Sequence, residues 1–191
     1  MIRIRLKYST QGKVRYISHL DLMRVFFKAC SRAHLPVALS QGFSPHLKLS
    51  FGPPLSLGIT SSGEYVDIYL TESVDVLAAR SVLQDALPEG LAILDLKEIS
   101  MDGPSIAASL CRAEYKIDIP ADKVNILADR LKLFSNSLVR KIGLDGNYLL
   151  VDVSIGQNGN VRPIDVLKGL FPEEDENELK LWKVNRERIY C

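Results

Sequence analysis

All three histidines of the chain lie within residues 13–58, and two of them are candidates for chemistry. An imidazole titrates near neutral pH, so it can accept and donate a proton during a reaction. His19 and His46 could therefore form an acid–base pair for RNA cleavage, or bind a metal together with Cys30. No HxxxH or HxxE spacing supports either role. We therefore predict no metal site, and assign catalysis, if there is any, to His19 and His46.

The loop from Ser40 to His46 is a second feature with binding chemistry. Gly42 permits backbone conformations that other residues resist, and Pro45 stiffens the exit. A structural turn with a hydrogen-bonded histidine is the alternative. Ligand sites gather polar groups from several loops. We therefore predict a cleft that combines the helix start, this loop and the following glycine-proline loop, with motif residues Ser18, His19, Asp21, Gln41, Gly42, Phe43 and His46.

Positive charge is concentrated at the beginning of the chain. Residues 1–60 hold nine Lys or Arg and one acid, a net charge of +8, whereas the whole chain is +1 and the remainder is therefore −7. Charge of one sign gathered in one region favours a polyanionic partner, although a solvated surface without a ligand is the alternative. The pattern predicts RNA binding by Arg3, Arg5, Lys7, Arg15, Arg24, Lys28, Arg32, Tyr65 and Tyr69.

Two elements would present these residues. Residues 2–8 alternate apolar and basic side chains, which predicts a strand with one basic face. Residues 64–71 predict a neighbouring strand whose Tyr65 and Tyr69 could stack on bases. That face could instead be covered by the second domain. Ser18 and Asp21 predict the start of a helix that ends before Pro36, with a basic stripe on one side.

The order of predicted elements repeats in the two halves. Each half runs strand, helix, strand, strand, helix, strand, which is typical of a ferredoxin-like unit. In the second half, Asp145-Gly146-Asn147 predicts a hairpin turn and Pro163 the first residue of a helix. We predict an α+β fold of tandem ferredoxin-like (βαββαβ) units with antiparallel sheets. The domains would be residues 1–100 and 110–191, joined by a linker near Gly103-Pro104.

Several function classes lack support in the sequence. No apolar run is long enough to span a bilayer, and three widely spaced cysteines, Cys30, Cys111 and Cys191, show no zinc spacing. We therefore expect a cytoplasmic protein without a membrane partner. No Walker loop, dinucleotide fingerprint, iron–sulfur triplet or nucleophile elbow is present, so we predict no cofactor.

Residues 13–72 closely resemble the opening of the bacterial radical SAM-linked protein family. The matching motifs are Ile17–Asp21 with Arg24, Ser40–Phe43 with Pro45-His46, Ser50-Phe51 with Pro53–Leu55, and Gly63–Tyr65 with Asp67. Leu47 departs from the family, which tends to have a second proline there. The family consists of uncharacterised proteins encoded beside, or fused behind, a cobalamin-binding radical SAM protein. The resemblance implies a role beside a radical enzyme and, from the family's gene neighbourhood, a connection with RNA.

Three functions are therefore open. The leading hypothesis is a non-catalytic RNA-binding or substrate-presenting partner of a radical SAM enzyme encoded nearby, with tRNA or rRNA as the RNA. The second is a metal-independent endoribonuclease similar to the CRISPR repeat-processing nucleases. The third is a protein-interaction module whose basic face binds an acidic protein surface.

Overall fold

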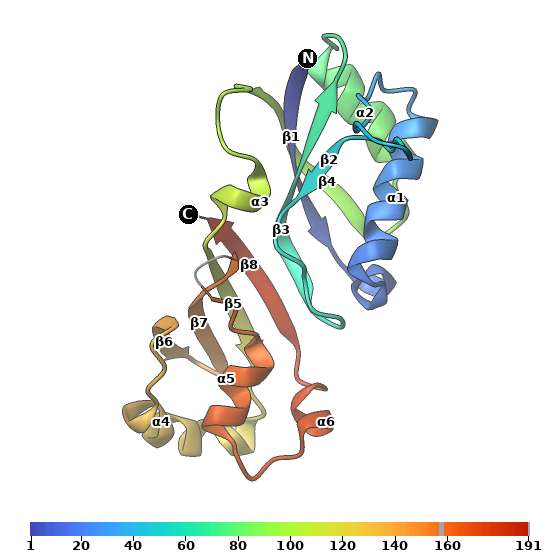
Figure 1. The fold of residues 1–191 in the computed structure, drawn as a ribbon. Helices are drawn as coiled ribbons and strands as arrows, with labels where there is room; N and C mark the ends of the chain where they lie inside the picture. The colour runs from blue at the N-terminus through green and yellow to red at the C-terminus, as the bar shows by residue number, and fades with distance from the viewer. Residues whose placement is uncertain (157–158, 191) are drawn as a thin grey trace. The chain divides into compact units, whose positions relative to one another are not determined.

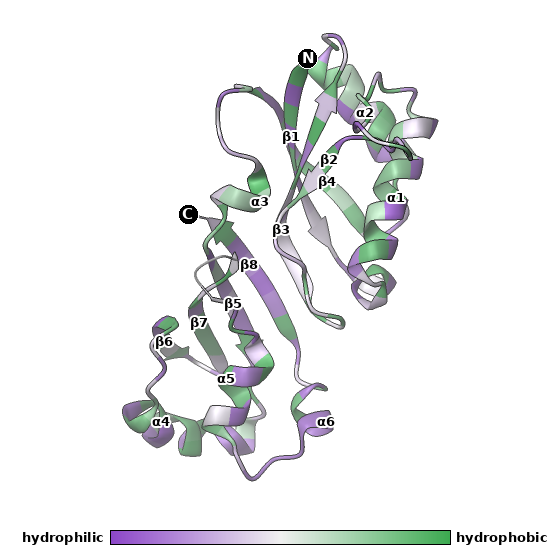
Figure 2. Cartoon of the chain, viewed as in Figure 1, coloured by the Kyte–Doolittle hydropathy of each residue, from purple (hydrophilic) through white to green (hydrophobic). Residues whose placement is uncertain are grey.

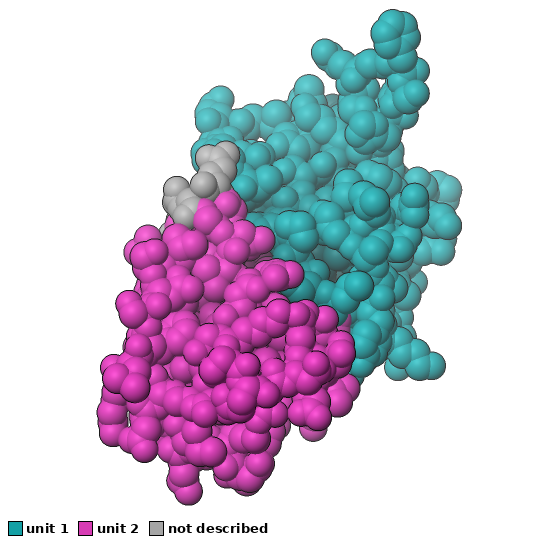
Figure 3. Space-filling model, turned by 60° about the horizontal axis from the view of Figure 1, so that its bottom comes forward, with its two compact units in different colours: residues 1–57, 63–109 teal, residues 58–62, 110–191 magenta. Residues whose placement is uncertain are grey.

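A computed structural model describes residues 1–156 and 159–190. The chain has a mixed α+β fold and forms two compact units, coloured separately in Figure 3. Unit 1 comprises residues 1–57 and 63–109, and unit 2 comprises residues 58–62 and 110–191. The first unit contains β1 (Ile2–Thr10), a 3-10 helix (Gly12–Tyr16), α1 (His19–Arg32), β2 (Leu49–Phe51), most of β3 (Thr60–Leu70), α2 (Val76–Ala86), β4 (Leu91–Ile99) and α3 (Ile106–Ser109).

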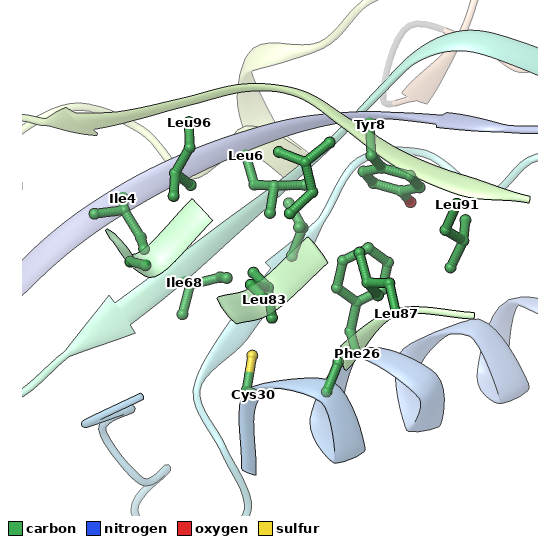
Figure 4. Close-up of a cluster of buried hydrophobic side chains, with 14 of the residues drawn as sticks. Ile4, Leu6, Tyr8, Phe26, Cys30, Ile68, Leu83, Leu87, Leu91 and Leu96 are labelled. Atoms are coloured by element: carbon green, nitrogen blue, oxygen red, sulfur yellow. The ribbon is translucent and has the colours of Figure 1, made fainter. Parts of the chain in front are cut away.

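The strands of unit 1 lie in the order β4-β1-β3-β2. β1 pairs with β4 and β2 pairs with β3, both in the antiparallel direction. α1 and α2 pack on one face of these strands (Figure 1), because the buried apolar residues of both helices and of the strands form one cluster. Figure 4 shows part of that cluster, in which Ile4, Leu6 and Tyr8 from β1 face Phe26 and Cys30 from α1 and Leu83 from α2.

Local sequence determines where α1 begins and which side it buries. The Ser18 hydroxyl accepts a hydrogen bond from the backbone N–H of Asp21 at 3.1 Å, which confirms the predicted N-cap. Leu22, Phe26, Ala29 and Cys30 recur at helical spacing and are buried. Arg24 and Lys28 are on the solvent side of the same helix.

The second unit repeats this order of elements. It contains β5 (Arg112–Asp118), a 3-10 helix (Ala121–Lys123), α4 (Val124–Leu133), β6 (Val139–Asp145), β7 (Tyr148–Ser154), α5 (Pro163–Leu170), α6 (Glu176–Leu179) and β8 (Val184–Tyr190). Its strands lie in the order β8-β5-β7-β6. The predicted hairpin between β6 and β7 is confirmed, and so is Pro163 as the first residue of a helix.

The first residues of β3 belong to unit 2 rather than to unit 1. Thr60 and Ser61 pair in parallel with Asn185 and Arg186 of β8. The Thr60 hydroxyl also donates to the Asn185 side-chain oxygen at 2.7 Å. β8 is largely hydrophilic in sequence (Figure 2) and is nevertheless part of a sheet. The sequence predicted a strand only from residue 64, so β3 begins four residues earlier than expected.

Gly90 connects α2 to β4 where no other residue fits. Its φ is +95°, and a Cβ atom there would lie 2.6 Å from the backbone oxygen of Gln11. We expect Gly90→Ala to lower the free energy of unfolding by about 2–3 kcal/mol, because the strained backbone and the clash add together. Gly12→Ala is the matched control, since Gly12 has a φ of +58° but open space around it. Equal losses in urea denaturation of the two variants would contradict the role of the clash.

Candidate nucleic-acid interface

The predicted basic face of β1 is occupied by a buried ion cluster. Asp67 of β3 has no exposed side-chain surface and binds Arg5 through two hydrogen bonds, from Nε to Oδ1 at 2.7 Å and from Nη2 to Oδ2 at 2.9 Å. Arg3, whose side chain is 4% exposed, lies 3.9 Å from the same carboxylate. The cluster therefore holds two of the cations that were expected to face RNA against one buried carboxylate.

Residues 100–109 cover this face within unit 1. Arg3 donates hydrogen bonds to the carbonyl oxygens of Gly103 and Pro104, each at 3.0 Å, and to that of Ser100. The backbone N–H of Ile106, the first residue of α3, donates to Asp67 Oδ2 at 3.0 Å. The expectation that Arg3 and Arg5 lie on an open RNA-binding face is therefore corrected, because a segment predicted to be a linker binds Arg3 and Asp67, and Asp67 in turn holds Arg5.

The rest of that face is partly accessible. Tyr65 and Tyr69 are half-buried, with the Lys7 ammonium 6.0 Å from the first ring centroid and the Lys48 ammonium 4.7 Å from the second. Burial raises the pKa of the Tyr65 phenol. Lys48 was not among the predicted RNA-binding residues, although it alternates with apolar neighbours in the sequence as a surface residue of a strand does.

The basic stripe of α1 is exposed, as its spacing predicted. Arg24, Lys28 and Arg32 all lie on the solvent side. Arg24 forms a surface ion pair with Asp21 at 2.7 Å, and Arg32 donates to the carbonyl oxygen of Ala86 at 2.6 Å. The pKa of Asp21 is lowered by the hydrogen bond from the Ser18 hydroxyl and then by Arg24. Exposed ion pairs are weak, so Arg24 can exchange its partner for a phosphate at little cost.

A groove runs beside the second half of this stripe. Lys28, Arg32 and His46 line it together with Phe27, Ser31 and Leu47, around a volume of about 460 Å³. The rings of Phe27 and His46 lie 6.4 Å apart. The groove therefore combines two cations with an aromatic side chain and an imidazole, which are groups that hold phosphates and bases.

The loop 40–46 projects from the edge of this groove. The backbone N–H of Ser40 donates to the carbonyl oxygen of His46 at 2.8 Å, which closes the loop. The Ser40 hydroxyl lies 3.0 Å from His46 Nδ1 and accepts from the His46 backbone N–H at 3.1 Å. Gln41 and Gly42 are exposed at the tip, where Gly42 has a φ of +131°, and Phe43 is fully exposed. The unburied Phe43 ring is available for stacking.

The predicted single cleft is divided into two sites. His19 lines a separate pocket with Arg15, Gly52 and Pro53, and its ring lies 5.8 Å from that of Phe51. Ser18 and Asp21 form the N-cap of α1, where the Ser18 hydroxyl donates to Asp21 Oδ2 at 2.7 Å. His46 instead contacts Phe27, which follows His19 by eight residues, or about 12 Å along a helix. The structure therefore does not bring the two histidines together as a nuclease pair.

Three further residues of the His19 pocket were not predicted to be functional. Tyr8, Thr10 and Glu64 line it, and all three are buried. The matching Gly63-Glu64-Tyr65 motif was a signal for Glu64, whereas Thr10 ends a strand and carried no signal. Arg15, predicted to contact RNA, lies half-buried in this pocket and donates to the Tyr16 hydroxyl at 2.6 Å.

Residues 1–156 and 159–190 contain neither a metal-ligand cluster nor a membrane-spanning helix. Within them no group of three or more His, Cys, Asp or Glu side chains is arranged to hold a metal ion. None of the helices in this part of the chain is both long and apolar enough to cross a membrane.

Comparison with known proteins places the chain in a family. No curated protein matches it. A solved structure described as an unknown protein from Galdieria sulphuraria is similar at 14% identity and a TM-score of 0.30, over 99% of this chain and 97% of that one. The family model described as an uncharacterized protein conserved in bacteria (DUF2344) matches residues 3–163. Because that match spans most of the length of the chain, the chain belongs to this family of uncharacterised bacterial proteins.

Proposed function

We propose that the chain is a non-catalytic RNA-binding or substrate-presenting partner of a radical SAM enzyme in the cytoplasm. RNA binding is supported by the exposed α1 stripe, whose Lys28 and Arg32 line a groove together with Phe27 and His46. The unburied Phe43 ring lies in the loop that ends at His46. Cations that track a backbone beside rings that stack on bases are how proteins bind single-stranded RNA. The RNA-contacting set becomes Arg24, Lys28, Arg32, Phe43 and His46, with Lys7, Lys48, Tyr65 and Tyr69 as a second group.

The proposed partner rests on sequence alone. Residues 13–72 carry the motifs of the radical SAM-linked family, and several of these residues line the groove or the His19 pocket. A protein encoded beside a radical enzyme has an evident use for RNA binding if that enzyme modifies tRNA or rRNA. The separation of His19 from His46 gives no support to the alternative of an endoribonuclease.

We also propose that each unit is ferredoxin-like. In unit 1 the chain order β1, α1, β2, β3, α2, β4 accompanies the sheet order β4-β1-β3-β2. In unit 2 the order β5, α4, β6, β7, α5, β8 accompanies β8-β5-β7-β6. Both match the split βαβ arrangement, in which the first and third strands are central.

Salt dependence tests RNA binding. Each phosphate contact to a single strand contributes about 0.7 to the slope of log affinity against log salt, because counterions are released. We expect Arg24→Ala with Lys28→Ala to flatten that slope by about 1.4 in filter binding. Phe43→Ala should weaken binding by about 1–3 kcal/mol without changing the slope, because stacking releases no ions.

A double variant on unit 2 provides the matched control. Arg140 and Lys141 of β6 are also exposed, so changing both to Ala removes the same charge at another place. If this control flattens the slope as much as the α1 variant, binding is not local to α1 and the proposed interface is wrong. Absence of RNA affinity at low salt, together with tight binding to the radical SAM protein, would favour the protein-interaction module.

A further inference from the structure

The His19 pocket holds polar groups from four separate segments. Thr10 ends β1, Arg15 belongs to the following 3-10 helix, His19 begins α1 and Glu64 lies in β3. Gly52 and Pro53 complete one wall. Segments far apart in sequence thus present a guanidinium, an imidazole, a carboxylate and a hydroxyl to one small space, which is the composition of a ligand site.

Two of these groups contain atoms with unmet hydrogen-bonding capacity. Thr10 is 4% exposed, and its hydroxyl oxygen is buried without a hydrogen-bond partner among the described residues. The Nε atom of Arg15 is likewise shielded from solvent and without a partner there. Because unpaired buried polar atoms are costly, nearly all of them in folded proteins have partners. Thr10 and Arg15 both line the pocket, so each supplies an unsatisfied hydrogen-bonding group to an external oxygen atom that enters it.

The size of the pocket and the charge of its lining restrict the kind of ligand that it can bind. The pocket has a volume of about 20 Å³, which accepts one group of the size of a water molecule. A phosphate or carboxylate is larger, and it would meet the carboxylate of Glu64, which is 4% exposed. A hydroxyl has the right size, carries no charge, and can both accept from Arg15 and exchange hydrogen bonds with Thr10.

We propose that this pocket binds a ribose hydroxyl of RNA and so distinguishes RNA from DNA. The inference rests on the proposed RNA binding, since the 2′-hydroxyl is the group by which a protein separates the two nucleic acids. The position of Tyr16 supports this proposal. Its ring centroid lies 4.8 Å from the Arg15 guanidinium, and the residue is 61% exposed. A base of the same nucleotide can stack on that ring while its hydroxyl enters the pocket.

The experiment compares RNA and DNA strands of one sequence at constant salt. The wild-type chain should prefer RNA by roughly 2- to 10-fold, the value of one hydrogen bond. Thr10→Val keeps the shape of the side chain and removes the hydroxyl, so it should abolish the preference while affinity for DNA stays unchanged. Thermal unfolding should show the variant folded, because the lost hydroxyl has no partner among the described residues.

Thr71→Val is the matched control. Its hydroxyl is exposed and donates to the Pro36 carbonyl at 3.1 Å, outside the residues that line the pocket. The control should keep the preference for RNA. Equal affinity of the wild-type chain for both strands, or a preference that survives Thr10→Val, would overturn the proposal.

A nucleoside titration separates this inference from RNA binding as a whole. If neither strand binds at low salt, the proposed RNA binding is wrong. Binding of a ribose hydroxyl in the pocket is then tested separately, by NMR titration of the chain with adenosine and with 2′-deoxyadenosine. Shifts of the Thr10 and Arg15 amide signals with adenosine alone support a hydroxyl site. Equal shifts with both nucleosides, no shifts, or the same shifts with inorganic phosphate contradict it.

Discussion

Asp67→Asn is expected to lower the free energy of unfolding of unit 1 by about 3–5 kcal/mol, the usual cost of removing one partner from a buried ion pair. Asp67 receives two hydrogen bonds from Arg5, one from the Ile106 backbone N–H, and the charge of Arg3 at 3.9 Å. Asparagine preserves the shape but supplies one oxygen and no charge, so Arg5, whose side chain is only 20% exposed, loses its counter-ion. Urea-dependent amide hydrogen exchange of β1 and β3 measures the loss.

The control for this substitution is Asp85→Asn. Asp85 is exposed on α2, so its replacement should change stability by less than about 0.5 kcal/mol. The cluster also predicts that Asp67→Asn increases exchange at Ile106, because the carboxylate oxygen that accepts its N–H is replaced. A loss below about 1 kcal/mol, which exposed pairs give, would show that the cluster is solvated in solution.

Cys30 is expected to resist thiol reagents while the chain is folded. The thiol is completely buried against the core, and burial raises its pKa from 9.0 to about 12. This increase in the pKa lowers the reactive thiolate population about 1,000-fold at pH 8, before steric protection is counted. Iodoacetamide followed by peptide mapping should label half-exposed Cys111 and leave Cys30 unmodified until the chain is unfolded.

The same pKa predicts how stability changes with pH. Above about pH 9 the unfolded thiol loses its proton and the folded one keeps it, so the unfolded state is favoured as pH rises. Between pH 8 and pH 10 this effect removes about 1.4 kcal/mol of stability. Cys30→Ala should remove that part of the pH dependence. Rapid labelling of Cys30 in the folded chain, or an identical pH dependence in the variant, would contradict the buried thiol.

Features that depend on neighbouring residues could be predicted from the sequence. The N-cap at Ser18, the buried side of α1 and its exposed stripe all follow from contacts between residues three or four apart. The hairpin before β7 and the helix start at Pro163 depend on residues with particular backbone preferences. The order of strands and helices in both units followed from the same local patterns.

The sequence could not show what covers each surface. The alternation in β1 correctly separates an apolar face from a basic one, yet Arg3 binds carbonyl oxygens about one hundred residues later. Thr60 and Ser61 have no strand-like pattern, and they extend β3 because Asn185 and Arg186 supply backbone partners. His19 begins α1 and contacts Phe51 of β2, whereas His46 contacts Phe27, eight residues further along α1.

The candidate site likewise contains residues that the sequence could place and residues that only the tertiary structure brings together. The charge and position of Arg24, Lys28 and Arg32 were determined by sequence, because helical spacing alone places them on one exposed side. The pocket of Thr10, Arg15, His19 and Glu64 was decided by tertiary structure. Periodicity reports which residues share a face of one element, whereas a pocket requires side chains from several elements to meet, and only the packing of β1, α1 and β3 brings these together.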